Sequence, residues 1–168
     1  MNNFKQYTAM DISSYFINKN VSPLKLQKLL YYSQLWFFVK NKKYLFTDQI
    51  SAWIFGPVVY NVWSNFRFIK RTDIIPRHKA NNVNLDDIIN HLDDVWNAYG
   101  HLDGSQLVEL THNDKPWLIS RAGLLNEQPS DKDVIINLDT TSDFKLNNDF
   151  TIPKVTFSSN SLGHFSNF

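Results

Sequence analysis

The stretch from Ala52 to Tyr60, Ala-Trp-Ile-Phe-Gly-Pro-Val-Val-Tyr, constrains the fold of this chain more than any other. An apolar run rich in β-forming residues stops at Gly56-Pro57, and a helical spacing of apolar residues begins directly after it. Gly56 can adopt backbone angles that other residues avoid, and Pro57 has the φ angle of a first helical position. The junction therefore predicts a strand over residues 50–55, followed by a helix that runs to about Lys70.

Two helices are predicted before this junction, each from a capping signal at its start. Thr8 and Asp11 resemble a capping box and begin a helix over about residues 8–19. Ser22-Pro23 is an N-cap followed by a proline at the first helical position, and it begins a longer helix that runs to about Lys40. Apolar residues on both sides of the longer helix indicate that it is packed from several directions. The residues expected to form its solvent-facing edge are Lys25, Gln27 and Lys28.

Similar signals divide the rest of the chain into shorter elements. Asn84 begins a helix that ends at Gly100, and Asp103 with Gln106 begins a second one. The remaining short elements are predicted as a strand over residues 72–76, a helix that Pro116 opens and that reaches Ala122, and a helix over residues 134–138. Together these elements predict an α+β fold that is predominantly α-helical, a single globular helical domain with a small two- or three-stranded antiparallel sheet.

Composition favours a cytoplasmic protein that associates with neither membranes nor nucleic acid. The 168 residues contain 17 Lys and Arg against 16 Asp and Glu, so no net field draws the chain to phosphates or anionic lipid. The absence of cysteine excludes disulfides, thiolate zinc sites and a cysteine nucleophile, and it fits a reducing compartment. Residues 1–6 lack the pattern of a leader peptide, and the longest apolar-rich run, residues 29–39, is too short to span a bilayer.

The character of the chain changes at about residue 137, where Asn, Ser, Thr and Asp become frequent. This change divides the sequence into a domain over residues 1–136 and a C-terminal extension over residues 137–168. Isolated phenylalanines, among them Phe144, Phe150 and Phe157, follow one another along the polar extension. Such a segment can stay disordered, fold against a partner or wrap over its own domain, and all three alternatives stay open from the sequence.

The residues that could support chemistry do not form a recognisable active site or metal site. His112 is the best single candidate because Asp114 lies nearby, yet no nucleophile is paired with it. The five histidines lack metal-ligand spacing, and neither GxGxxG nor a P-loop is present. A structural histidine bonded to a backbone carbonyl is the favoured interpretation of His112. We therefore expect a binding protein rather than an enzyme, with no catalytic residue, metal or cofactor.

Three motifs occur in order along the chain: Leu-x-Leu-Gln-Lys-Leu-Leu-Tyr-Tyr at 24–32, Ala-Trp-x-x-Gly-Pro-Val at 52–58, and Thr-His-x-x-x-Pro-Trp-x-x-x-Arg at 111–121. Together they resemble the Panacea domain, the family of SocA-like antitoxins and their phage-associated relatives, over about residues 8–136. The resemblance implies a mostly helical domain with a small sheet, encoded beside a toxin that it neutralises by direct binding. Family partners vary, and some relatives act as adaptors that deliver the toxin to a protease.

The resemblance implies an antitoxin, with a role in phage defence, that occludes the active or substrate-binding site of its toxin. Small alarmone synthetase-like enzymes that modify tRNA are one class of toxin in the family, and the complex could be a higher-order hetero-oligomer. The alternatives are a protease adaptor and a DNA-binding autoregulator centred on the basic cluster at residues 67–79, a cluster for which a solvated face is the favoured reading.

The motif residues are expected to form the scaffold by which the domain is recognised. These residues are Leu26, Gln27, Lys28, Leu29, Tyr31, Trp53, Gly56, Pro57, His112, Pro116, Trp117 and Arg121. Contacts with the partner are expected instead from side chains near the Gly-Pro junction and on the extension, because aromatic and Arg side chains dominate protein interfaces. These candidate contact residues are Tyr60, Asn61, Arg67, Arg71, Phe144, Phe150 and Phe157.

Overall fold

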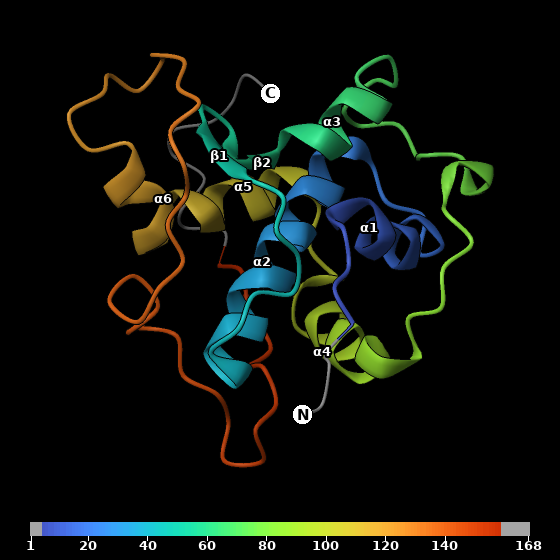
Figure 1. Ribbon diagram of the computed structural model, residues 1–168. Coiled ribbons are helices and arrows are strands. Elements are labelled where there is room, and N and C mark those ends of the chain that lie inside the picture. Colours follow the sequence, from blue (N-terminus) through green and yellow to red (C-terminus); the bar gives the residue numbers. More distant parts are fainter. Residues whose placement is uncertain (1–4, 159–168) are drawn as a thin grey trace.

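The computed structural model describes residues 5–158 (Figure 1). Its elements, in chain order, are α1 (Ala9–Ile17), α2 (Pro23–Asn41), β1 (Ile50–Trp53), β2 (Gly56–Val59), α3 (Tyr60–Phe66), the short 3₁₀ helices η1 (Arg77–Lys79) and η2 (Asp86–Ile88), α4 (Ile89–Tyr99), α5 (Gly104–His112) and α6 (Lys115–Ser120). The sheet has two antiparallel strands. The predicted fold class, α+β and predominantly helical with a small antiparallel sheet, is confirmed.

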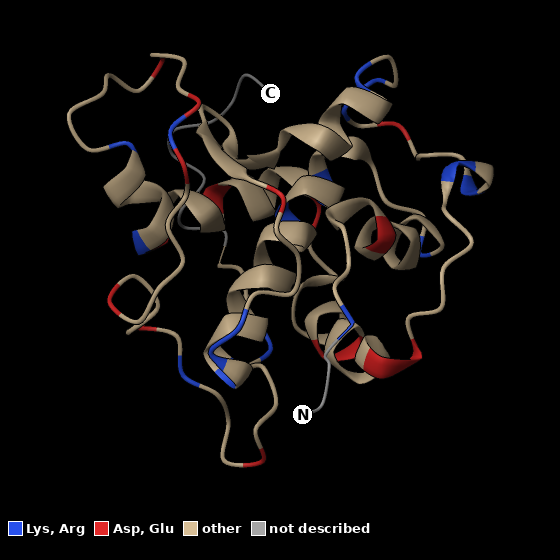
Figure 2. Cartoon of the chain, viewed as in Figure 1, with Lys and Arg blue, Asp and Glu red and all other residues tan. Residues whose placement is uncertain are grey.

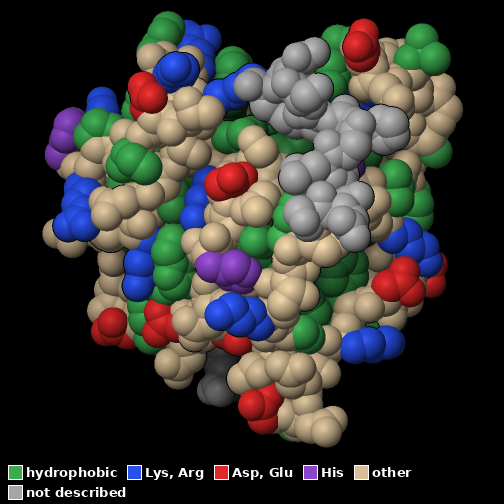
Figure 3. Space-filling view, turned by 180° about the vertical axis from the view of Figure 1, so that it is seen from behind, with side chains coloured by type: hydrophobic (Ala, Val, Ile, Leu, Met, Phe, Trp, Pro, Cys, Tyr) green, Lys and Arg blue, Asp and Glu red, His purple; other side chains and the backbone are tan. Residues whose placement is uncertain are grey.

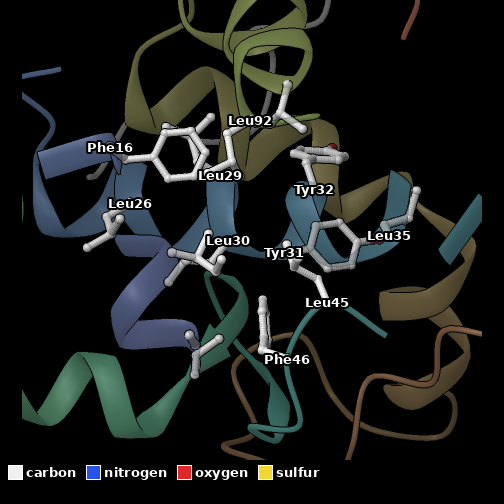
Figure 4. Close-up of a cluster of buried hydrophobic side chains, with 14 of the residues drawn as sticks. Phe16, Leu26, Leu29, Leu30, Tyr31, Tyr32, Leu35, Leu45, Phe46 and Leu92 are labelled. Carbon is white, nitrogen blue, oxygen red and sulfur yellow. The ribbon is translucent and has the colours of Figure 1, made fainter. Parts of the chain in front are cut away.

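Helix α2 forms the centre of the molecule, and α1, α4, α5 and the hairpin pack around it (Figure 1). Its apolar side chains lie in two directions, with Leu29 and Tyr32 toward Leu92 of α4 (Figure 4). Leu30 and Tyr31 lie on another side of the helix and face the segment between α2 and β1. A helix that is apolar on several sides is stable only when it is covered on each of them, as the sequence predicted for this one.

Three of the predicted capping signals lie at the starts of their helices, whereas the helix predicted from Asn84 begins as η2 at Asp86 and continues as α4 only from Ile89, neither with a side-chain cap. The Thr8 hydroxyl accepts a hydrogen bond from the Asp11 N–H, and the Asp11 carboxylate accepts one from the Thr8 N–H. Asp103 and Gln106 form the same reciprocal pair at the start of α5. Ser22 caps α2 through the N–H of Lys25. These side chains satisfy N–H groups that have no partner within the helix.

The Gly-Pro junction starts a strand, and the prediction that a helix begins at Pro57 was wrong. Ile54 and Phe55 form a two-residue turn, after which β2 pairs with β1 from Trp53↔Gly56 to Ile50↔Val59. Helix α3 begins only at Tyr60 and ends at Phe66 rather than near residue 70. Proline is tolerated in an edge strand where its missing N–H would point away from the neighbouring strand. Pro57 pairs with Ala52 in this register, and its carbonyl bonds outside the sheet.

Two further element predictions were wrong. Residues 72–76 form no strand; instead Ile75 is buried and its N–H donates to the Val21 carbonyl. Residues 134–138 form no helix, because this segment lies extended beside β1. The Val134 N–H donates to the Ile50 carbonyl at 2.8 Å, and the Ala52 N–H donates to the Lys132 carbonyl at 2.8 Å. The outward-facing backbone groups of a buried strand require partners, and this segment supplies them.

The described part of the C-terminal extension wraps over the domain, shown in orange to red in Figure 1. Ile152 is buried, and its N–H donates to both carboxylate oxygens of Asp94, at 3.0 and 3.1 Å. The Val155 N–H donates to the Ala98 carbonyl at the end of α4. Of the alternatives left open by the sequence, residues 137–158 adopt the wrap over their own domain. The division at residue 137 stays a prediction.

Residues 159–168 of the extension lie outside the described residues, as do residues 1–4 of the segment in which no leader peptide was expected. Over residues 5–158, none of the helices combines the length and the hydropathy needed to cross a bilayer.

On the face seen from behind, apolar side chains lie in small groups between charged ones (Figure 3).

Candidate functional site

The first motif holds the outer edge of β2 through two buried polar side chains. Lys28 is fully buried, and its Nζ donates to the Pro57 carbonyl at 2.8 Å. Gln27 is 5% exposed; its Oε1 accepts from the Val59 N–H at 2.7 Å, and its Nε2 donates to the Val59 carbonyl. The prediction that Gln27 and Lys28 form a solvent-facing edge was therefore wrong. The backbone of a buried edge strand must be paired, and these side chains pair it.

Burial in an apolar region disfavours the charged form of an amine. This effect lowers the pKa of Lys28 to about 7. At neutral pH the amine is therefore close to half-protonated. Its neutral form still has N–H groups that can donate to the Pro57 carbonyl.

The third motif holds the turn and the β1 side of the hairpin. The Trp117 indole N–H donates to the Trp53 carbonyl at 2.9 Å. Arg121, which is 7% exposed, donates from Nη1 to the Ala52 carbonyl at 2.9 Å. Its Nη2 donates to carbonyls of the loop after α6, including that of Gln128 at 2.7 Å. A planar guanidinium suits this role because its several N–H donors have fixed directions.

His112 is packed into the same arrangement. Its ring stacks on that of Trp117 with centroids 4.2 Å apart and an interplanar angle of 17°, and it hydrogen-bonds with the backbone of Ile54. Burial lowers the pKa of His112 to about 4, and the positive charges of Lys28 and Arg121 act in the same direction. The ring is therefore neutral at pH 7. The geometry agrees with the favoured interpretation of a structural histidine.

The three motifs meet at Gly56. Its φ angle is +93°, a region that side chains with a Cβ rarely adopt. A Cβ at this position would lie 2.5 Å from Thr111 Oγ1 and 3.0 Å from Lys28 Cε. Gly56 is therefore required both by the backbone conformation and by the close approach of the first and third motifs.

A direct comparison with known protein families identifies the family of the chain. The model of a family described as "Antitoxin SocA-like, Panacea domain" matches residues 26–118, more than half of the chain. The chain belongs to the Panacea family. This membership supports an antitoxin role and, in general, a toxin as partner. No curated protein and no solved structure matches the chain.

Most of the remaining motif residues of the Panacea domain lie in the core. Leu26, Leu29 and Tyr31 on α2 are fully buried, and Pro116 is buried in the first turn of α6. The Trp53 indole donates from Nε1 to Asp131 Oδ1 at 3.0 Å. Trp53 itself is only half-buried. It therefore lies at the boundary between the core and the surface.

Sequence reasoning missed a buried polar cluster beside the motifs. The Tyr32 hydroxyl donates to Asp114 Oδ2 at 2.8 Å, and the buried ring of Tyr31 lies against that of Tyr32, with centroids 4.9 Å apart. Burial raises the pKa of Asp114 to about 7, although the hydrogen bond from Tyr32 opposes the shift. The Tyr-Tyr pair of the first motif and the aspartate two residues after His112 are the signals that could have indicated this cluster. Asp114 and His112 are thus engaged with different partners.

A groove opens between the start of α2, the hairpin turn, α3 and residues 129–131, with a volume of about 850 Å³. We call it the α2–α3 groove. Its aromatic lining residues are Trp53, Phe55, Trp63 and Phe66, and the basic residues of its rim are Arg67, Lys70 and Arg71. Figure 2 shows Lys and Arg gathered in the turn that follows α3. The structure thus brings two predicted contact residues, Arg67 and Arg71, to the rim of an aromatic groove.

Tyr60 and Asn61 lie beside a second hollow of about 320 Å³, which they share with Asp131. Tyr60 is 52% exposed, and its ring centroid lies 5.6 Å from that of Trp63. The Asn61 amide donates to Asp48 Oδ1 at 3.0 Å. Asp131 lines both hollows, so these two predicted contact residues lie next to the α2–α3 groove.

The three phenylalanines of the extension differ in their surroundings. Phe144 is half-buried and meets the ring of Trp36 edge-on, with centroids 5.5 Å apart. Phe157 is also half-buried and packs against the core, whereas Phe150 is 77% exposed. Their role in partner binding stays a prediction. Of the three, only Phe150 presents most of its side chain to solvent.

The polar side chains of the motifs bind the hairpin backbone. Across residues 5–158, no group of three or more His, Cys, Asp or Glu side chains could hold a metal ion. Lys28, Trp117 and Arg121 each donate to a carbonyl of the hairpin. This arrangement stabilises the hairpin, which forms one wall of the α2–α3 groove.

Proposed function

We propose that this Panacea domain is a cytoplasmic antitoxin that binds its toxin directly and covers the toxin's active or substrate-binding site. The observation that carries the proposal is the α2–α3 groove, in which aromatic side chains of α3 and of the hairpin held by the family motifs lie beside the exposed Arg67 and Arg71. Trp, Tyr and Arg are the residues that most often dominate binding energy in protein interfaces. A rigid support beneath them reduces the entropy lost on binding.

Occlusion requires a stable surface and no covalent step in the antitoxin. His112, Lys28 and Arg121, which are the motif residues with chemically versatile side chains, are all engaged with the hairpin or its neighbours. Their arrangement supports a scaffold role for the motifs and a binding role for the groove beside them. The class of toxin is proposed from the family alone, with translation-targeting enzymes such as small alarmone synthetase-like tRNA-modifying toxins as one candidate.

The test uses the protein encoded by the reading frame adjacent to this one, where this family has its toxin. Its expression alone should stop growth, and co-expression with the full chain should restore growth. The two proteins should co-purify, and light scattering would give the stoichiometry of the complex and show whether it is a higher-order hetero-oligomer. Purified antitoxin should inhibit the purified toxin in a reaction that contains no other protein.

The amount of toxin in the rescued cells separates occlusion from the alternative of a protease adaptor. Occlusion predicts that the toxin persists in an inactive complex, whereas an adaptor predicts its loss in cells that have the protease and its persistence in cells without it. A catalytically inactive toxin variant is the control, because it should bind the antitoxin without affecting growth. Restored growth without any complex between the purified proteins would contradict the proposal.

A further inference from the structure

The α2–α3 groove combines two kinds of surface that recognise different parts of a ligand. Its inner lining is apolar and includes the aromatic side chains of Trp53, Trp63 and Phe66. Trp53 and Trp63 meet edge-on with ring centroids 5.2 Å apart, which fixes both rings in place. The volume of about 850 Å³ is large enough for several apolar side chains of a partner, since sites that bury whole ligands occupy roughly 300–1,000 Å³.

The charge on the rim of the groove is unbalanced. Arg67, Lys70 and Arg71 follow one another in the turn after α3, and all three are exposed. The acidic residue among the groove's lining, Asp131, accepts a hydrogen bond from the Trp53 indole at 3.0 Å. The whole chain has a formal charge of only +1, so the positive field is local to this surface. A partner placed here gains most from carboxylates that face the three cations.

Aromatic rings orient the two guanidinium groups. The Arg71 guanidinium carbon lies 5.3 Å from the centroid of Phe55, and that of Arg67 lies 4.7 Å from the centroid of Phe68. Cation–π contact restricts the rotamers of these long side chains before any partner binds. A planar guanidinium in a fixed orientation is suited to bidentate hydrogen bonds with a carboxylate.

We propose that the α2–α3 groove binds an acidic segment of the toxin, in which large apolar side chains enter the groove while neighbouring Asp or Glu carboxylates pair with Arg67 and Arg71. The inference rests on the proposed function, because it names the part of the toxin that the antitoxin recognises. An acidic polypeptide fits better than a nucleic acid. A phosphate backbone would use the cations but would leave the aromatic lining of the groove uncovered, and a nucleic-acid surface is usually basic over a larger area.

The central experiment compares charge reversal at the rim with the same change elsewhere. The double variant R67E/R71E should weaken binding of the adjacent-frame protein on the order of 30-fold or more, because Arg side chains at such sites commonly dominate affinity. The matched control is K43E/K79E, which changes the net charge equally at two exposed residues that do not line the groove. This control should bind like the wild-type chain, and circular dichroism should show that all three proteins are folded.

Peptides identify the bound segment. Overlapping 15-residue peptides that cover the adjacent-frame protein should bind the wild-type chain only where acidic and large apolar residues occur together. Replacing Glu with Gln and Asp with Asn in those peptides should abolish the difference between the wild-type chain and R67E/R71E. Preferential binding of basic peptides would overturn the proposal.

A small probe tests the groove independently of the toxin. The dye 1-anilinonaphthalene-8-sulfonate joins an apolar ring system to one negative charge, and it should fluoresce with the wild-type chain and K43E/K79E but only weakly with R67E/R71E. If the wild-type chain fails to bind the adjacent-frame protein, the proposed function fails, and this probe still decides whether the groove has the inferred chemistry.

Three results would overturn the inference while leaving direct neutralisation intact. The first is a complex with R67E/R71E that is as tight as that of the wild-type chain. The second is binding of the chain's own promoter DNA that R67E/R71E abolishes. The third is a concentration-dependent dimer of the chain that the same variant disperses, which would show that a second copy occupies the groove.

Discussion

Gly56 shows how one residue can be fixed by three separate segments. Its positive φ angle closes the hairpin, and the space where a side chain would lie is filled by Thr111 and Lys28. A glycine at this place in the sequence indicated an unusual backbone conformation, and that part of the prediction was sound. Lys28 and Thr111, which contact Gly56, are distant from it in the sequence. Their proximity depends on the folded chain, so the local sequence does not reveal it.

Substitution of Gly56 by alanine should therefore be much more destabilising than the same change at another glycine with positive φ. We expect G56A to lower the free energy of unfolding by about 3 kcal/mol, from the sum of backbone strain and overpacking. Gly123 has a φ angle of +81°, and a Cβ added there would meet no atom within 4 Å, so G123A should cost only about 1 kcal/mol. Urea unfolding of both variants measures the difference, and equal losses would show that packing at Gly56 is unimportant.

Lys28 should make the stability of the protein depend on pH. Its pKa is about 7 in the folded protein and 10.5 in an exposed lysine, so the unfolded chain binds more protons between these values. The destabilisation is complete below pH 7 and disappears as the pH rises toward 10.5. The free energy of unfolding should therefore increase by about 2 kcal/mol between pH 7 and pH 9.

The variant K28M isolates this effect because methionine is an unbranched side chain, one atom shorter than lysine, without a titratable group. Urea unfolding at pH 7, 8 and 9 should give a clearly flatter profile for K28M than for the wild-type chain. The buried tyrosines titrate above this window, and Asp114, whose pKa is about 7, is present in both proteins, so its contribution cancels in the comparison between them. Parallel profiles for the two proteins would mean that Lys28 titrates as an ordinary exposed lysine.

At the scale of elements, the sequence predicted those structures whose causes are local. The capping residues Thr8, Ser22 and Asp103 each lie within three residues of the N–H group that they cap, and all three helices begin where expected. The hairpin was missed because Ile54-Phe55 is not a typical two-residue turn such as Asn-Gly. The helical spacing of apolar residues after Pro57 is real, but the helix begins only after strand β2 has ended. Val58 and Val59 fit the apolar pattern of either a strand or a helix, so the sequence did not separate the two.

The difference between local and long-range causes also applies to the candidate site. Motif residues could be singled out from the sequence, but their common target could not, because the hairpin carbonyls that bind Lys28, Trp117 and Arg121 belong to distant positions. A lysine beside apolar residues on a helix is usually at the solvent edge, so its burial became evident only with the hairpin in place. The basic cluster was visible in the sequence, whereas the aromatic groove beneath it required α2, α3 and the turn to be brought together.

At the scale of the whole molecule, the extension contributes to the stability of the domain that it covers. We expect F144A to lower the free energy of unfolding by about 1–2 kcal/mol, because the phenylalanine is half-buried against Trp36. F150A should change stability by less than about 0.5 kcal/mol, since Phe150 is 77% exposed. Thermal and urea unfolding of the two variants provide the comparison, and an unchanged F144A would mean that the wrap is loosely held.

The same pair of variants tests whether the extension also contacts the toxin. A contact through Phe150 would make F150A bind the toxin more weakly while it unfolds like the wild-type chain. Full affinity in both variants would assign the extension to stability alone. The sequence left these outcomes open because sparse aromatic residues on a polar segment suit either an intramolecular or an intermolecular surface.

Both edges of the two-stranded sheet are already covered. Residues 132–134 run beside β1, and the Gln27 amide and the Lys28 amine bind the backbone of β2 in place of a further strand. Within the described residues, a binding partner therefore finds no vacant strand position beside the hairpin. The same closure deprives other copies of the chain of a template for edge-to-edge aggregation.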